Sequence, residues 1–144
     1  MSHLSKPILG TQLKWSHPLN KGLAGFWLMN EGNGNKIQDL SMNGNVGTLV
    51  GMANPPTAAS GWNPGEKGIG LNFDGTDDYI DCGNGMSLNT TTKMSVSFWT
   101  KGENINAPIG YYGIFRKESY QTSGWNLFLV NGTSTNMKKI NFRL

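Results

Sequence analysis

The chain has 144 residues, with 12 Lys and Arg against 9 Asp and Glu and a net charge of +3. A charged fraction of 15% argues against a disordered, charge-solvated chain, and the scattered lysines form no basic stripe for nucleic-acid phosphates. The single cysteine excludes an internal disulfide framework, and no apolar run approaches the ~20 residues of a membrane-spanning helix. We therefore expect one domain with neither nucleic acid nor a membrane as its partner.

The first 20 residues predict an irregular N-terminal arm. Pro7, Gly10 and Pro18 interrupt any periodic pattern there, so the arm leans either on its own domain or on a neighbouring subunit. The arm also lacks the apolar core of a secretory signal, which indicates synthesis in a cytoplasm. Residues 21–144 are expected to form a single domain.

The first part of this domain combines one apolar segment with many turns. The sequence GLAGFWLMNEG at 22–32 is apolar on both faces and is bounded by glycines, which predicts a buried strand. The Asn-Gly dipeptides at 33 and 43 predict tight turns. Residues 52–65 are rich in Pro and Gly, which predicts a loop and excludes a helix.

The rest of the chain predicts strands. GIGLNFDG and DDYIDCG are expected to be two strands that meet at a turn. In KMSVSFWTKG at 93–102, Met94, Val96 and Phe98 alternate with Ser95, Ser97 and Trp99, which is the period of a strand with one face in a core. Three more strands are expected in YYGIFRKES, GWNLFLVNG and KKINFRL.

No segment repeats its apolar residues at the helical period, so the sequence predicts an all-β protein, either a sandwich or a barrel. The last alternating segment stops at Leu144 without a turn or a polar tail. We expect such a domain either to be completed by another chain or to belong to a longer polypeptide.

Several motifs in order resemble a known family. GLAGFWLMNEGNGNKIQDLSMNGNVGTL, GLNFDGTDDYIDCGN and MSVSFWTKG are together similar to the concanavalin A-like, laminin G-type jelly roll, over about residues 22–102. The resemblance implies an antiparallel β-sandwich, here incomplete at the C-terminus because the family's closing strands have no counterpart. Met42 also departs from the family, which usually has glycine at this position. The opening of the chain is similar to laminin G-type proteins of phages and uncultured viruses.

The stretch NFDGTDDYIDCG concentrates four carboxylates, namely Asp74, Asp77, Asp78 and Asp81. We expect them to cap turns and face water around a structural hairpin, and the alternative is a metal role for one of them. Glycosidases of this fold carry a Glu-x-Asp-x-x-Glu run, which the segment DDYID does not match. The resemblance therefore argues against a hydrolase, and we expect no enzyme activity.

The loop EGNGNKIQDLSMNGN is a stronger calcium candidate, with a plain turn as the alternative. It offers oxygen ligands from Glu31, Asp39, Asn43 and Asn45, together with free glycine carbonyls. Related jelly rolls often hold a structural Ca²⁺ near this turn, with a further acid from the closing strand. That acid has no counterpart in this chain.

Aromatic side chains in loop-like stretches are candidates for stacking on sugar rings. They are Trp62, Tyr111, Tyr112 and Tyr120. The alternative is that each packs locally over the end of the sandwich.

These features favour a non-catalytic structural or decoration protein on the virion surface of a phage-like particle. Its partners would be other virion subunits, including further copies of the chain in a homo-oligomer. The alternative is a carbohydrate-binding or adhesion module with a glycan ligand, either by itself or as a fragment of a larger extracellular protein.

Overall fold

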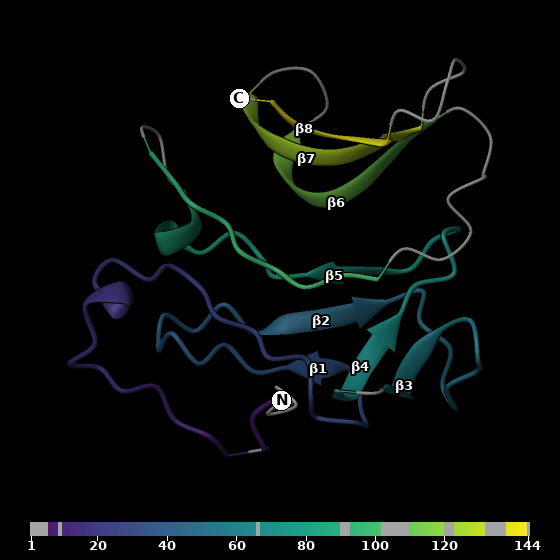
Figure 1. The fold of residues 1–144 in the computed structure, drawn as a ribbon, viewed down its shortest axis with the longest axis horizontal. Coiled ribbons are helices and arrows are strands. Elements are labelled where there is room, and N and C mark those ends of the chain that lie inside the picture. The colour runs from purple at the N-terminus through teal and green to yellow at the C-terminus, as the bar shows by residue number, and fades with distance from the viewer. Residues whose placement is uncertain are drawn as a thin grey trace. The chain divides into compact units, whose positions relative to one another are not determined.

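The computed structural model of the chain describes residues 6–8, 10–65, 67–89, 93–101, 110–119, 123–131 and 138–143. The chain divides into two compact units, residues 1–94 (unit 1) and residues 95–144 (unit 2) (Figure 1). A single domain over residues 21–144 stays a prediction.

Unit 1 contains a three-stranded sheet made of β1 (Lys36–Ile37), β2 (Gly47–Val50) and β5 (Tyr79–Asp81). The spatial order is β1-β2-β5 and both pairings are antiparallel. Lys36 lies opposite Thr48 and donates from Nζ to Thr48 Oγ1 at 2.7 Å. The long connection from β1 to β2 places the loop 38–46 at one end of this sheet.

A separate hairpin in unit 1 pairs β3 (Gly61–Gly65) with β4 (Gly68–Asn72). Trp62 lies opposite Leu71 in this pair. The predicted loop over 52–65 is therefore wrong for its last five residues, which form a strand because β4 offers them a partner.

Unit 2 contains β6 (Gly110–Ser119), β7 (Ser123–Asn131) and β8 (Lys138–Arg143), in that spatial order and antiparallel throughout. The three strands predicted at the end of the chain are confirmed. The register of β6 against β7 shifts between Gly113 and Phe115, which is the signature of a β-bulge.

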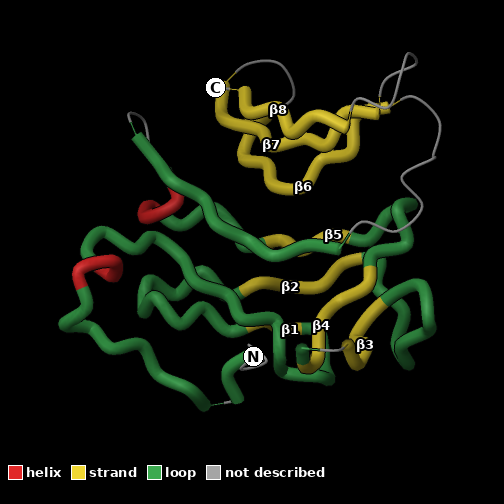
Figure 2. Tube along the Cα trace, in the orientation of Figure 1, coloured by secondary structure: helices red, strands yellow, loops and turns green. Residues whose placement is uncertain are grey.

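The described part of the chain is all-β with antiparallel sheets, as predicted. Helix occurs there only as two short 3₁₀ turns, η1 (Pro18–Asn20) and η2 (Met86–Leu88), and Figure 2 shows long loops between the strands. None of the helices in the described ranges is long and apolar enough to cross a bilayer.

Two predicted strands are wrong. Residues 22–32 form no strand, because Phe26 directs its backbone N–H to the Asp39 carboxylate and its carbonyl to Leu40 N–H instead of to a ladder. Residues 93–101 also form no strand, although their alternation is the cleanest in the sequence (Figure 2). The predicted strands around Asp74 do exist as β4 and β5, but β4 pairs with β3 and β5 pairs with β2, so the predicted pairing is wrong.

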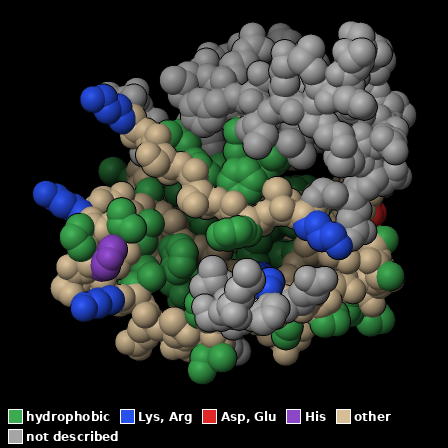
Figure 3. All heavy atoms as spheres, viewed as in Figure 1, with side chains coloured by type: hydrophobic (Ala, Val, Ile, Leu, Met, Phe, Trp, Pro, Cys, Tyr) green, Lys and Arg blue, Asp and Glu red, His purple; other side chains and the backbone are tan. Residues whose placement is uncertain are grey.

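The buried apolar core of unit 1 is small. Among its described residues, Ile37 and Trp62 are the buried apolar side chains. Many large apolar side chains are exposed instead, and on the face seen in Figure 3 apolar side chains lie among polar ones at the surface. Unit 1 is therefore held together to an unusual extent by hydrogen-bonded loops, and the candidate sites lie in these loops.

Candidate functional site

Asp39 organises the loop between β1 and β2. Its Oδ1 accepts the backbone N–H groups of Phe26 at 3.0 Å and Ser41 at 2.8 Å, and its Oδ2 accepts that of Asn45 at 2.9 Å. Leu40 N–H returns a bond to the Phe26 carbonyl at 2.8 Å. One carboxylate thereby joins the segment before β1 to both ends of the turn. We call this arrangement the Asp39 turn, comprising residues 39–45.

Asn43 and Asn45 extend the Asp39 turn towards the preceding segment. Asn43 Nδ2 donates to the Leu23 and Ala24 carbonyls at 2.9 and 3.2 Å. Asn45, which is buried, donates from Nδ2 to the Ala24 carbonyl and to Ser87 Oγ, both at 2.9 Å. The two amides therefore act as donors that fix the turn against residues 23–24.

Glu31, the fourth expected calcium ligand, has different hydrogen-bond partners. Its two carboxylate oxygens accept the backbone N–H groups of Asn30 at 3.0 Å and Gln38 at 2.8 Å. Calcium takes six to eight oxygen ligands, and backbone N–H donors already use lone pairs of both carboxylates of the set. The protein's own N–H donors thus already occupy part of the oxygen set that calcium would need. Calcium at this loop stays a prediction.

The hydrogen bonds of the Asp39 turn also determine its charge state. Burial alone would raise the pKa of Asp39, but the hydrogen bonds from Ser41, Phe26 and Asn45 outweigh it and hold that pKa below its ordinary value. The carboxylate is therefore ionised at neutral pH, which strengthens each of these bonds.

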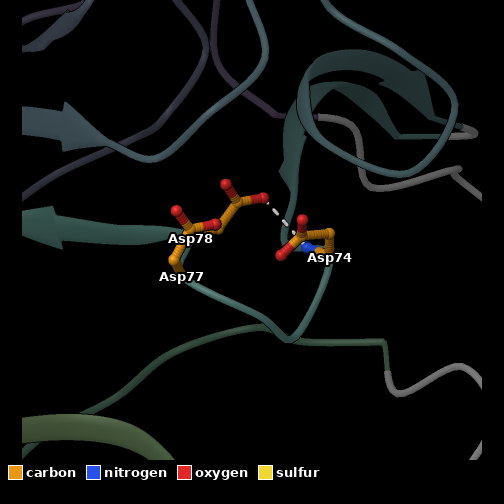
Figure 4. A group of neighbouring side chains, drawn as sticks. All are labelled: Asp74, Asp77 and Asp78. Atoms are coloured by element: carbon orange, nitrogen blue, oxygen red, sulfur yellow. Dashed lines mark hydrogen bonds between the residues drawn. The ribbon is translucent and has the colours of Figure 1, made fainter.

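The acidic stretch brings three carboxylates together at the turn before β5. One carboxylate oxygen from each of Asp74, Asp77 and Asp78 lies within 4.8 Å of the others (Figure 4). Asp78 Oδ2 accepts Asp74 N–H at 2.9 Å, and Asp74 Oδ1 accepts Thr76 N–H at 2.8 Å, so the aspartates cap the turn as expected. Asp78 Oδ1 is buried without a hydrogen-bond partner. A cation would fit this oxygen-only set chemically, while exposed acidic groups commonly lie together without one.

Asp81 takes part in a separate turn. Its Oδ1 accepts Gly83 N–H at 2.8 Å, at the end of β5. This is the turn-capping role expected for the fourth aspartate of the stretch.

Trp62 lies in the wall of a cavity of about 110 Å³. Only 7% of its surface is exposed, and its Nε1–H donates to the Gly34 carbonyl at 2.8 Å. The cavity is lined by residues 32–35, by Met52, Ala53, Asn54 and Pro56, and by Leu49 of β2.

The other three expected sugar contacts belong to unit 2. Tyr111 and Tyr112 lie in β6 of unit 2, and their side chains fall outside the described part. Tyr120 lies outside the described residues.

Neither Asn33 and Asn54, which line this cavity, nor the contacts of Lys6 were predicted from the sequence. Lys6 N–H donates to the Lys67 carbonyl at 2.7 Å, and its Nζ donates to the Met29 and Ile69 carbonyls at 3.0 and 2.7 Å. Burial lowers the pKa of Lys6, and the charge of Glu31 opposes that shift. Lys6 therefore holds its part of the arm to residues 29 and 67–69 of unit 1. A lone lysine before a proline carries no pattern that predicts such contacts.

Cys82 and His17 belong to residue types that often act in catalysis, but their contacts here suit a structural role. Burial, with the nearby charges of Asp81 and Asp39, raises the pKa of the Cys82 thiol to about 11, so it is protonated at neutral pH and poorly nucleophilic. His17 Nδ1 accepts Leu19 N–H at 3.3 Å and caps η1. His3 lies outside the described residues.

Comparison of the chain with protein-family models, with curated proteins and with solved structures found no match.

Proposed function

We propose that the chain is a non-catalytic structural subunit, displayed as a decoration protein on the surface of a phage-like particle. In this proposal a laminin G-like β-sandwich is completed by contacts with neighbouring subunits, in a homo-oligomer or with other virion proteins. The observation that carries the proposal is the surface of residues 93–101, which we call the apolar segment.

The apolar segment combines strand-like patterning with exposure on both faces. The exposed fractions are 36% for Val96, 40% for Phe98 and 96% for Trp99. Large apolar side chains that stay exposed can mark an interaction site. The exposure of Trp99, with that of Phe98 and Val96, supports a contact that another chain supplies.

The contacts of the arm favour the apolar segment over the arm as the contact with a neighbouring subunit. Lys6 and Pro7 contact unit 1, where Asn30 Nδ2 donates to the Pro7 carbonyl at 2.6 Å. An arm that is bound to its own unit is less available as an anchor for a neighbour. The apolar segment is therefore the better candidate for the assembly contact.

The test is the molar mass of the purified chain, measured by light scattering across a wide concentration range. We expect a defined oligomer above the 15.7 kDa monomer, and Trp99→Ser should shift it towards the monomer. Met86→Ser is the matched control, because Met86 is 91% exposed and lies outside the apolar segment. A monomer at every concentration would argue against self-assembly, and equal effects of the two variants would argue against this segment as the contact.

The second candidate function is a carbohydrate-binding or adhesion module, including one within a larger extracellular protein. The specific observation in its favour is the cavity beside Trp62, whose lining combines apolar residues with three asparagines. Sugar sites commonly join an aromatic or apolar surface to a few placed polar groups. A glycan array probed with the labelled chain tests this candidate, and an array without any bound glycan would argue against it.

A further inference from the structure

The cavity beside Trp62 lies wholly within unit 1 and has two chemically different parts. Leu49, Pro56 and Trp62 are apolar lining residues, and the polar residues Asn33, Asn35 and Asn54 line the cavity as well. We propose that this cavity binds one neutral sugar ring, as the terminal residue of a glycan. This inference rests on the second candidate function and names the site and the ligand class for it.

The charge of the lining determines the charge of the ligand. None of the described residues that line the cavity carries an ionisable side chain. A charged sugar such as a uronic or sialic acid would lose hydration on entry without gaining an opposite charge. The lining therefore selects a neutral ligand.

The asparagine side chains favour a ligand that carries hydroxyl groups. Within the described residues, the side-chain amides of Asn33, Asn35 and Asn54 make no hydrogen bond, whereas those of Asn43 and Asn45 are used in the Asp39 turn. Each free amide offers both a donor and an acceptor, which matches a hydroxyl group that also donates and accepts. The apolar lining complements the C–H face that a pyranose ring presents next to its hydroxyls.

The volume determines the size of the ligand. Pockets for drug-sized ligands measure roughly 300–1,000 Å³, and this cavity measures about 110 Å³. It is large enough for several waters, and their release would accompany the entry of part of one ring. Longer glycans would place only one residue inside, with the remainder in solvent.

The walls are held in place before any ligand arrives. The bond from Trp62 Nε1 to the Gly34 carbonyl ties the indole to the opposite loop. Ser60 Oγ accepts Ala53 N–H at 2.8 Å, and a side chain at Gly61, where φ is +93°, would meet the Ala53 carbonyl at 2.7 Å. Loop 53–61 thus closes tightly on β3, and preorganised walls lower the entropic cost of binding.

The test is a titration of the full chain with methyl α-glucoside, methyl α-mannoside and methyl β-galactoside, followed by NMR of the asparagine side-chain amides. We expect at least one of these neutral pyranosides to shift the Asn33 or Asn54 amide signals, with a millimolar Kd. Asn33→Ala and Asn54→Ala should each weaken binding about tenfold, because each removes a hydroxyl partner. Asn84→Ala is the matched control, because Asn84 is exposed and does not line the cavity.

The outcomes separate the cavity from the broader function. Sugar binding that survives both cavity substitutions would overturn the cavity as the site and leave carbohydrate binding standing. Tighter binding of methyl glucuronide than of methyl glucoside would overturn the neutral-ligand assignment. If none of the three sugars binds and the glycan array is also blank, the inference fails together with the second candidate function. Circular dichroism of each variant checks that the exposed substitutions leave the fold intact.

Discussion

The Asp39 turn forms a defined structure without an apolar pattern, whereas the apolar segment 93–101 has a clear apolar pattern and forms no strand. The Asp39 turn has no apolar periodicity, yet its side chains bind backbone groups of the turn and of residues 23–26 and give it a defined conformation. The apolar segment has clean period-two alternation, yet it forms no strand. The difference shows that a turn can carry its own partners in its sequence, whereas a strand requires a neighbour that supplies them.

The same contrast appears in the energetics. Asp39 replaces hydration by three charge-assisted bonds within one stretch of chain, so its contribution to stability is independent of protein concentration. The exposed surface of Val96, Phe98 and Trp99 adds apolar burial only when a second surface covers it, at roughly 25 cal/mol per Å². The predictions below separate these two kinds of stabilisation.

The largest effect is expected from Asp39→Ala, which leaves the N–H groups of Phe26, Ser41 and Asn45 without their acceptor. We expect the free energy of unfolding to fall by about 2–4 kcal/mol, because unpaired, partly buried donors are costly. Urea denaturation measures it. Asp77→Ala is the control, since Asp77 is exposed, and it should stay within about 0.5 kcal/mol of the wild type. Equal losses in both variants would contradict a central role for Asp39.

A smaller effect is expected from acid. The pKa of Asp39 is held below its unfolded value of 3.8, so its contribution is fully present above that pH. The contribution should disappear as the pH falls through the lower, folded pKa. Denaturation midpoints measured from pH 6 to pH 2 should therefore decline less steeply in Asp39→Asn than in the wild type. Parallel curves for the two proteins would show that Asp39 does not carry this dependence.

A gain in stability is expected from Met42→Gly. Met42 adopts φ +65° in the Asp39 turn, a left-handed conformation that strains a side chain, and 79% of it is exposed, so little packing is lost. Glycine relieves the strain but adds entropy to the unfolded chain, which leaves a net gain of about 0.5 kcal/mol. Thermal unfolding measures it. Met86→Gly, within η2, should instead lower the midpoint, and the same loss at position 42 would count against strain there.

The smallest effect on the stability of the isolated chain is expected from Trp99→Ser. Because this side chain is 96% exposed, its removal should change the unfolding free energy of the dilute chain by less than about 0.5 kcal/mol. At high concentration the wild type should gain stability through association and the variant should not. Denaturation at two protein concentrations measures both terms. A large loss in the dilute variant would mean that its own chain buries Trp99.

The sequence predicted the elements whose determinants are local. The three strands of unit 2 and the turn at the second Asn-Gly dipeptide follow from period-two alternation and turn chemistry, and Gly44 has the positive φ that such a turn requires. Met42 was identified as a departure from the glycine that the laminin G-type motif has there, and its φ is the left-handed one that glycine serves. The resemblance itself stays a prediction.

The sequence did not predict which strands pair or where distant residues meet. β5 pairs with β2 across a long connection, and Lys6 reaches the carbonyls of Met29 and Ile69. Such contacts depend on the path of the whole chain, which no local period encodes. For the same reason Trp62 was found as an aromatic candidate, while Asn33 and Asn54 at the same cavity were not.

Hydrogen exchange of the backbone amides, measured at low and high protein concentration, compares the two regions within one experiment. The account predicts that amides bonded within the Asp39 turn, such as those of Ser41 and Asn45, are equally protected at both concentrations. Amides of residues 95–100 should exchange rapidly in the dilute chain and become protected as the concentration rises. Full protection of residues 95–100 at the lowest concentration would contradict the account, because the segment would then find its partner within its own chain.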